Sequence, residues 1–180
     1  HYRKRVCLIG PESTGKTTLA RELAGRFATA WVPEYARGLI EAMGGAVTPG
    51  LFGRILAGQR ASEAALEDRA GPLLICDTDA FTTALYHELY VGPAPEAFWA
   101  EARRRRYDLY LITDCDTPFI ADGQRHHEER RAWFRDRCLA WASERGTPAV
   151  LLRGSWEERR AMAVTAVERL MTPSVITGSS

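Results

Sequence analysis

The segment Val6–Thr17 reads VCLIGPESTGKT, a short apolar run followed by a full GxxxxGKT pattern. This pattern binds phosphate when a strand precedes the loop and an amphipathic helix follows it. Both are predicted here. Residues 5–9 form the strand, and Leu19, Leu23 and Phe27 repeat at helical spacing after the loop. The segment therefore predicts a P-loop at the start of an α/β domain.

The residue types of the loop explain how it would hold a nucleoside triphosphate. Glycines let the backbone turn its N–H groups inward around the β-phosphate, and the helix that follows adds its positive dipole end. The lysine reaches the β- and γ-phosphates, and the next hydroxyl is a ligand for Mg²⁺. The residues that we expect to bind ATP are Gly10, Glu12, Ser13, Thr14, Gly15, Lys16, Thr17 and Thr18.

A second apolar run, residues 73–76, ends in the acid Asp77, as a Walker B strand does. At the carboxyl edge of a parallel sheet Asp77 would hold Mg²⁺ together with Thr17, directly or through a water. Asp79 follows two residues later. It either contacts the substrate beside the phosphates or caps the next helix, since Asp is a favoured N-cap.

The predicted second strand, residues 30–32, ends beside the expected acceptor pocket. Pro33 stops the strand and places Glu34 at the carboxyl edge, where an acid can orient or deprotonate a hydroxyl. Arg37 lies one helical turn further, and Trp31 or Tyr35 would stack on an aromatic ring of the acceptor. The alternative is a solvated Glu–Arg pair with the aromatic rings in the core.

Later segments supply candidates for closing the site. Residues 116–127 follow the fourth predicted strand, where a lid belongs, and Arg125 with either Arg130 or Arg131 would contact the transferring phosphoryl group. A plain surface loop is the alternative. Trp156 follows the fifth predicted strand, where the adenine of ATP would lie. A capped surface helix explains its position equally well.

The rest of the chain indicates one soluble domain. Apolar runs at 109–112 and 149–152 complete five predicted strands that alternate with helices. Residues 1–171 are predicted to form a single domain, and the small polar tail 172–180 is predicted to be disordered. A net charge of +1 favours neither nucleic acid nor an anionic membrane as a partner. The four cysteines lack zinc-ligand spacing, and free thiols indicate a cytoplasmic protein.

Taken together, these motifs resemble the ribosylnicotinamide kinase domain of NadR-type proteins. The matching pieces occur in the family's order across about residues 5–170. They are the P-loop, Pro33–Arg37, Gly58–Gln59, Asp77–Asp79 with Thr82–Thr83, Tyr107–Leu109, and Pro118 with Asp122–Arg125. The resemblance implies a three-layer P-loop fold like that of nucleoside monophosphate kinases, with a lid and strand order 2-3-1-4-5.

The same resemblance implies an activity. ATP and Mg²⁺ would phosphorylate the 5′-hydroxyl of nicotinamide riboside, giving nicotinamide mononucleotide. Proteins of this type commonly carry an adenylyltransferase domain upstream; either such a domain belongs to a longer protein, or this chain performs the kinase step by itself. Two alternatives stay open: a kinase for another nucleoside, a vitamin or a nucleic-acid 5′ end, and an ATP-binding regulatory module without a dedicated acceptor.

Overall fold

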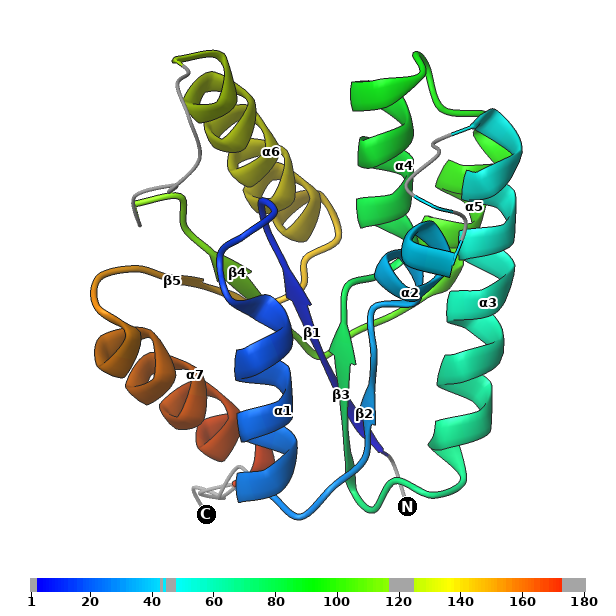
Figure 1. Ribbon diagram of the computed structural model, residues 1–180. Helices are drawn as coiled ribbons and strands as arrows, with labels where there is room; N and C mark the ends of the chain where they lie inside the picture. Colours follow the sequence, from blue (N-terminus) through cyan, green and yellow to red (C-terminus); the bar gives the residue numbers. More distant parts are fainter. Residues whose placement is uncertain (1–2, 43, 45–47, 117–124, 173–180) are drawn as a thin grey trace, which may run out of the picture.

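The computed structural model describes residues 3–42, 44, 48–116 and 125–172. Its centre is a five-stranded parallel sheet in the order β2-β3-β1-β4-β5, as the resemblance implied (Figure 1). The predicted strands are present and differ from the observed ones by no more than one residue at either end. The strands are β1 (Lys4–Ile9), β2 (Trp31–Val32), β3 (Leu73–Asp77), β4 (Leu109–Thr113) and β5 (Ala149–Leu152).

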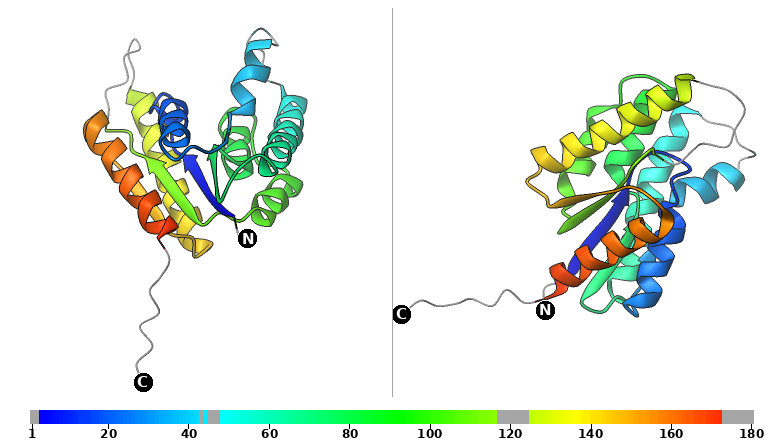
Figure 2. Two further views of the ribbon diagram at one scale, coloured as in Figure 1. Left: turned by 90° about the horizontal axis from the view of Figure 1, so that it is seen from below. Right: turned by 90° about the vertical axis from the view of Figure 1, so that its left-hand side faces the viewer.

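Helices cover both faces of the sheet, so the fold has three layers (Figures 1 and 2). One apolar core lies between the sheet and α1 and α7, and a second lies between the sheet and α4, α5 and α6. The helices are α1 (Lys16–Arg26), α2 (Tyr35–Ala42), α3 (Pro49–Glu67), α4 (Ala80–Tyr90), α5 (Glu96–Arg104), α6 (Arg125–Glu144) and α7 (Trp156–Met171).

Alternation along the central strand assigns its side chains to the two cores. Cys7 and Ile9 of β1 belong to the α4–α6 core, whereas Val6 and Leu8 belong to the α1–α7 core. All four side chains are fully buried, as expected for a parallel strand covered on both faces. β1 is therefore rigidly held, and the loop that follows it is positioned by the centre of the sheet.

The last helix begins with a capping box. The Ser155 side chain accepts a hydrogen bond from the Glu158 backbone N–H, and the Glu158 carboxylate accepts one from the Ser155 backbone N–H. This reciprocal capping box fixes the start of α7 beside the P-loop. Among the described residues, no helix is both long and apolar enough to cross a bilayer. The predicted tail, beyond Thr172, lies outside the described residues.

The carboxyl ends of β1, β3 and β2 lie at one edge of the sheet. In Figure 1 the loop after β1 lies at the upper end of the sheet, with α6 on one side and α2 and α4 on the other. In open α/β sheets, ligands bind outside the carboxyl ends of the strands. The predicted site residues are therefore gathered where this topology binds ligands.

Candidate active site

The loop between β1 and α1 has the backbone of a phosphate cradle. Gly10, Ser13 and Gly15 have positive φ angles of 140°, 57° and 84°. A Cβ at Gly10 would overlap Thr113, and one at Gly15 would lie 2.6 Å from the ring of Trp156. Glycine is required at both positions, because the backbone angle and the close neighbour each exclude a larger residue.

Two further contacts hold this loop against the rest of the fold. The Thr14 hydroxyl donates to the Pro11 carbonyl at 2.7 Å and lies 2.6 Å from the Thr113 hydroxyl at the end of β4. On the other side, the ring of Trp156 at the start of α7 lies against Gly15. Trp156 is thus next to the loop, which is compatible with its predicted contact to nucleotide.

Lys16 is the first residue of α1 and is 6% exposed. Its Nζ donates to the Pro11 carbonyl at 2.6 Å. Burial lowers the pKa of Lys16, and the carboxylates of Glu34 and Asp77 oppose that shift. The ammonium group is therefore held over the loop by a single carbonyl, in a place where a polyphosphate can replace that partner.

Asp77 and Thr17 meet as the sequence predicts. The Thr17 hydroxyl donates to Asp77 Oδ2 at 2.6 Å, and Asp77 is fully buried at the end of β3. Burial raises the pKa of Asp77 to about 6, although the Thr17 hydrogen bond lowers it. The second carboxylate oxygen, Asp77 Oδ1, is buried without a hydrogen-bond partner. A buried oxygen of this kind is costly unless a cation or a donor reaches it.

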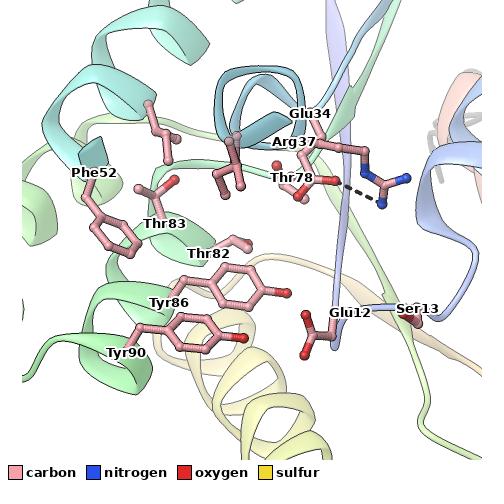
Figure 3. A pocket seen from close by; sticks show the side chains of 13 residues that line it. Glu12, Ser13, Glu34, Arg37, Phe52, Thr78, Thr82, Thr83, Tyr86 and Tyr90 are labelled. Atoms are coloured by element: carbon pink, nitrogen blue, oxygen red, sulfur yellow. Dashed lines mark ion pairs between the residues drawn. The ribbon is translucent and has the colours of Figure 1, made fainter. Parts of the chain in front are cut away.

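A cavity of about 360 Å³ adjoins the P-loop (Figure 3). This volume is in the range of small-molecule binding sites. Glu12 and Ser13 of the P-loop line one part of the cavity, and Glu34 and Arg37 line another. Glu34 pairs with Arg37 at 3.5 Å, and its side chain is 16% exposed. The predicted acceptor acid thus lies in one cavity with the phosphate loop.

Aromatic residues from α3 and α4 form another wall of the cavity. They are Phe52, Tyr86 and Tyr90, and the two tyrosine rings stack with centroids 6.0 Å apart. In Figure 3 both tyrosine hydroxyls point toward Glu12. Burial and the nearby Glu12 carboxylate raise the pKa of Tyr90. The sequence analysis missed this wall, although the four-residue spacing of Tyr86 and Tyr90 on a helix that starts at the same sheet edge was a usable signal.

The structure places Trp31 and Tyr35 elsewhere than expected. Trp31 packs into the α1–α7 core, on the sheet face that it shares with its β3 neighbour Ile75. Tyr35 is 37% exposed, and its ring lies against Gly58 of α3. Neither lines the cavity, because strand alternation turns Trp31 to the other face of the sheet and α2 directs Tyr35 toward α3. The aromatic rings that line the cavity are those of Phe52, Tyr86 and Tyr90, so the positions of Trp31 and Tyr35 do not support the predicted stacking on the acceptor.

Asp79 occupies the capping position that the sequence left open. Its Oδ1 accepts from the backbone N–H and the hydroxyl of Thr82, both at 2.9 Å, and its Oδ2 accepts from the Tyr110 hydroxyl at 3.1 Å. Asp79 is 3% exposed, and Thr78, Thr82 and Thr83 line the cavity around it. The structure gives Asp79 the role of N-cap for α4; a contact with substrate stays a prediction.

Two arginines of α6 lie near the P-loop. Arg130 and Arg131 line a smaller cavity, of about 80 Å³, that Pro11, Glu12 and the two tyrosines also line. Both arginines therefore stay candidates for contacting a phosphoryl group. Residues 117–124 of the predicted lid and the side chain of Arg125 lie outside the described residues.

With this geometry established, comparisons identify the family. The profile of a family described as an AAA domain, AAA_28, matches residues 5–159. The chain belongs to this AAA domain family. Its P-loop and its sheet edge are therefore those of a nucleotide-binding family, as the geometry indicates.

Among curated relatives, the AAA domain is similar to NadR, a trifunctional NAD biosynthesis/regulator protein, from Salmonella typhimurium and from Escherichia coli. Each is 30% identical over 128 residues, which cover 69% of this chain and 31% of the relative. The chain thus spans about a third of the length of these relatives. The resemblance to NadR-type proteins is confirmed.

Solved structures of NadR proteins are also similar to this chain. A NadR protein in complex with NR is 29% identical with a TM-score of 0.79, over 100% of this chain and 55% of that one. A NadR protein in complex with NAD and AMP-PNP is 26% identical with a TM-score of 0.76, over 100% and 52%. Thymidylate kinase from Ehrlichia chaffeensis, 14% identical with a TM-score of 0.65 over 94% and 100%, shares the fold. The AAA domain has the predicted nucleoside-monophosphate-kinase-like architecture.

The donor set at the P-loop of this AAA domain fits Mg²⁺. The described residues contain no group of three or more His, Cys, Asp or Glu side chains arranged to hold a metal. P-loop enzymes need no such group, because Mg²⁺ keeps several waters and binds one or two protein ligands plus substrate phosphates. Thr17 Oγ1 and the partnerless Asp77 Oδ1 are suited to that role, and Mg²⁺ there would neutralise phosphate charge.

Proposed function

We propose that this chain is an ATP-dependent kinase that phosphorylates an alcohol group of a small acceptor, with nicotinamide riboside as that acceptor. The observation that carries the proposal is the cavity shared by the P-loop and Glu34. A phosphate cradle and a carboxylate that can accept a hydroxyl proton lie on the walls of one cavity. This is the arrangement that phosphoryl transfer to an alcohol requires.

The chemistry of the cavity supports a cationic aromatic acceptor. The pyridinium ring of nicotinamide riboside carries a positive charge. Tyr86 and Tyr90 offer stacked aromatic faces, and Glu12 and Glu34 contribute negative charge to the same space. A cation is attracted both to a ring face and to a carboxylate. The NadR structure in complex with NR, 29% identical, supports the same choice.

The roles of the chain's own residues follow from their positions. Lys16, released from the Pro11 carbonyl, offsets the charge on the β- and γ-phosphates. Glu34 orients the acceptor hydroxyl toward the γ-phosphate and takes up its proton. Because phosphoryl transfer proceeds through a loose transition state, the orientation supplied by Glu34 contributes more than its basicity. Arg125 and either Arg130 or Arg131 would contact the transferring group.

The experiment is a coupled assay of ATP consumption in the presence of Mg²⁺. We expect turnover to depend on nicotinamide riboside and the product to be nicotinamide mononucleotide, identified by mass spectrometry. Uridine, thymidine and a 5′-hydroxyl oligonucleotide serve as competing acceptors. Turnover with one of these compounds and none with nicotinamide riboside would show that the active compound, and not nicotinamide riboside, is the acceptor. ATP hydrolysis that no acceptor accelerates would favour an ATP-binding regulatory module instead.

A further inference from the structure

A buried glutamine holds the turn that carries Glu34. Gln59 of α3 is 3% exposed, and its Oε1 accepts a hydrogen bond from the Tyr35 backbone N–H at 3.2 Å. Tyr35 is the first residue of α2, and Glu34 directly precedes it. The first N–H groups of a helix have no partner within the helix, so an acceptor from another element fixes where that helix begins. Gln59 supplies that acceptor from across the α2–α3 contact.

A second contact fixes the same turn. The ring of Tyr35 lies against the backbone of Gly58, the neighbour of Gln59, so closely that a Cβ at Gly58 would overlap three ring carbons. Two other glycines of α3, Gly50 and Gly53, have open space where their Cβ would lie. The Tyr35 ring of α2 therefore occupies the space that a Cβ at Gly58 would need. The helix itself gains nothing from glycine, which is a poor helix former.

Gln59 lies next to a buried polar cluster, and its own Nε2 is buried without a hydrogen-bond partner. One turn further along α3 is Glu63, 3% exposed, which accepts from the Tyr107 hydroxyl at 3.2 Å and pairs with Arg105 at 3.4 Å. Burial raises the pKa of Glu63, while Arg105, Tyr107 and Gln59 act against that rise. Arg105 and Tyr107 hold the Glu63 carboxylate in one arrangement. The segment before β4 thereby holds α3, and α3 holds the start of α2.

We infer that Gln59 and Gly58 are positioning residues for the acceptor site, setting the place of Glu34 through the first turn of α2. Neither residue lines the cavity, so neither is expected to touch the acceptor. This inference rests on the proposed function for its catalytic consequence. A carboxylate displaced by a fraction of an ångström orients a hydroxyl poorly. Substitutions of Gln59 or Gly58 are therefore expected to lower kcat.

The first test is a double-mutant cycle with Glu34→Gln and Gln59→Ala. Gln59→Ala by itself should lower kcat about tenfold and leave the KM for ATP within about twofold. In the Glu34→Gln background, Gln59→Ala should lower kcat less than about twofold further, because the residue through which it acts is already disabled. If the decreases in kcat caused by the two substitutions multiply in the double variant, the inference is overturned. An unchanged kcat in Gln59→Ala would overturn it as well.

Gly58 allows a matched comparison within one helix. Gly58→Ala should lower kcat about tenfold, whereas Gly53→Ala, the same change on the same helix, should leave kcat unchanged. Tyr35→Ala removes the ring that a Cβ would meet, so Gly58→Ala should cost less than about twofold in that background. If Gly58→Ala and Gly53→Ala behave alike, the packing argument is wrong.

Hydrogen exchange separates this inference from the proposed function. The Tyr35 amide should exchange about tenfold faster in Gln59→Ala than in the unchanged protein, while amides of β1 and β3 keep their protection. An unchanged Tyr35 amide would overturn the positioning role whatever the activity. If no acceptor is phosphorylated but Tyr35 exchange accelerates, the proposed function fails and the structural role of Gln59 stands.

Discussion

At the residue scale, the site is governed by a few buried polar groups that are incompletely satisfied. Lys16 has a carbonyl in place of a counter-charge, and Asp77 keeps one oxygen without a partner. Burying such groups costs free energy in the unliganded protein. Mg²⁺ and phosphate can remove that cost on binding, so the same residues that weaken the fold strengthen the affinity for nucleotide.

Asp77 makes the stability of the unliganded protein dependent on pH. Its pKa is raised to about 6 in the fold and is close to the ordinary value in the unfolded chain. Between these two values the folded protein holds a proton that the unfolded chain releases. The free energy of unfolding therefore falls as the pH rises through this window and stays reduced above it.

Asp77→Asn removes this titration. Measured by urea unfolding in EDTA, the substitution should raise the free energy of unfolding by about 2 kcal/mol more at pH 8 than at pH 4. Added Mg²⁺ and ATP should stabilise the unchanged protein more than the variant at pH 8. An effect of Asp77→Asn that is the same at both pH values would show that the carboxyl does not titrate in this way.

Glu34→Gln tests the acceptor acid. The substitution keeps the shape of the side chain but removes the charge and the ability to take up a proton. We expect kcat to fall about 10²-fold with the KM for ATP changed less than about twofold. Glu168→Gln, on the surface pair with Arg26, is the matched control and should leave both constants unchanged. A variant that loses ATP affinity instead would refute the assigned role of Glu34.

At the scale of secondary-structure elements, the start of α4 joins stability to the site. Asp79 caps this helix, and Thr82 and Thr83 of its first turn, together with Tyr86 and Tyr90, form much of the cavity wall. A cap that fixes the start of a helix also fixes the direction of the side chains in the turns that follow. The arrangement of these cavity-lining side chains therefore depends on Asp79, which does not line the cavity itself.

Substitutions at Asp79 separate a capping role from a substrate contact. Asp79→Ala loses the cap and leaves the buried Tyr110 hydroxyl without its acceptor, so it should destabilise the protein by about 2–3 kcal/mol in urea unfolding. Asparagine caps helices about as well as aspartate, so Asp79→Asn should cost less than about 1 kcal/mol. If Asp79→Asn folds well yet raises the acceptor KM tenfold or more, Asp79 binds the substrate.

At the scale of the whole molecule, the sheet brings elements from across the sequence to one edge. The P-loop follows β1, Asp77 ends β3 and Glu34 follows β2, although these segments are far apart in the chain. Ligands at this edge contact several elements at once. Binding should therefore stabilise the complete fold and not one loop.

Thermal unfolding measures this coupling. MgATP at about 100 times its Kd should add about 2.7 kcal/mol of stability, which for a protein of this size corresponds to a Tm increase of about 5–11 °C. EDTA should reduce the increase. Lys16→Ala should melt near the unchanged protein without ligand, because Lys16 faces the phosphate site, but should show little increase with MgATP. A full increase in Lys16→Ala would contradict the P-loop assignment.

Much of the fold was readable from the sequence because its signals are local. Strand β1, the glycines of the loop and the helix after it are specified within residues 5–27, and the final capping box within four residues. The acids Glu34 and Asp77 could be predicted because each lies at the carboxyl end of a strand, and parallel strands end at a common edge. These features need no knowledge of distant contacts.

The tertiary structure decided the rest. Whether Trp31 or Tyr86 lines the cavity depends on which sheet face and which helix surface border it. Asp79 and Gln59 make their hydrogen bonds with Tyr110 and Tyr35, which are 31 and 24 residues away in the sequence. The sequence by itself determined the phosphate-binding half of the site, because that half is one continuous segment. The acceptor half is assembled from α2, α3 and α4, and its side-chain directions are set by how these helices pack.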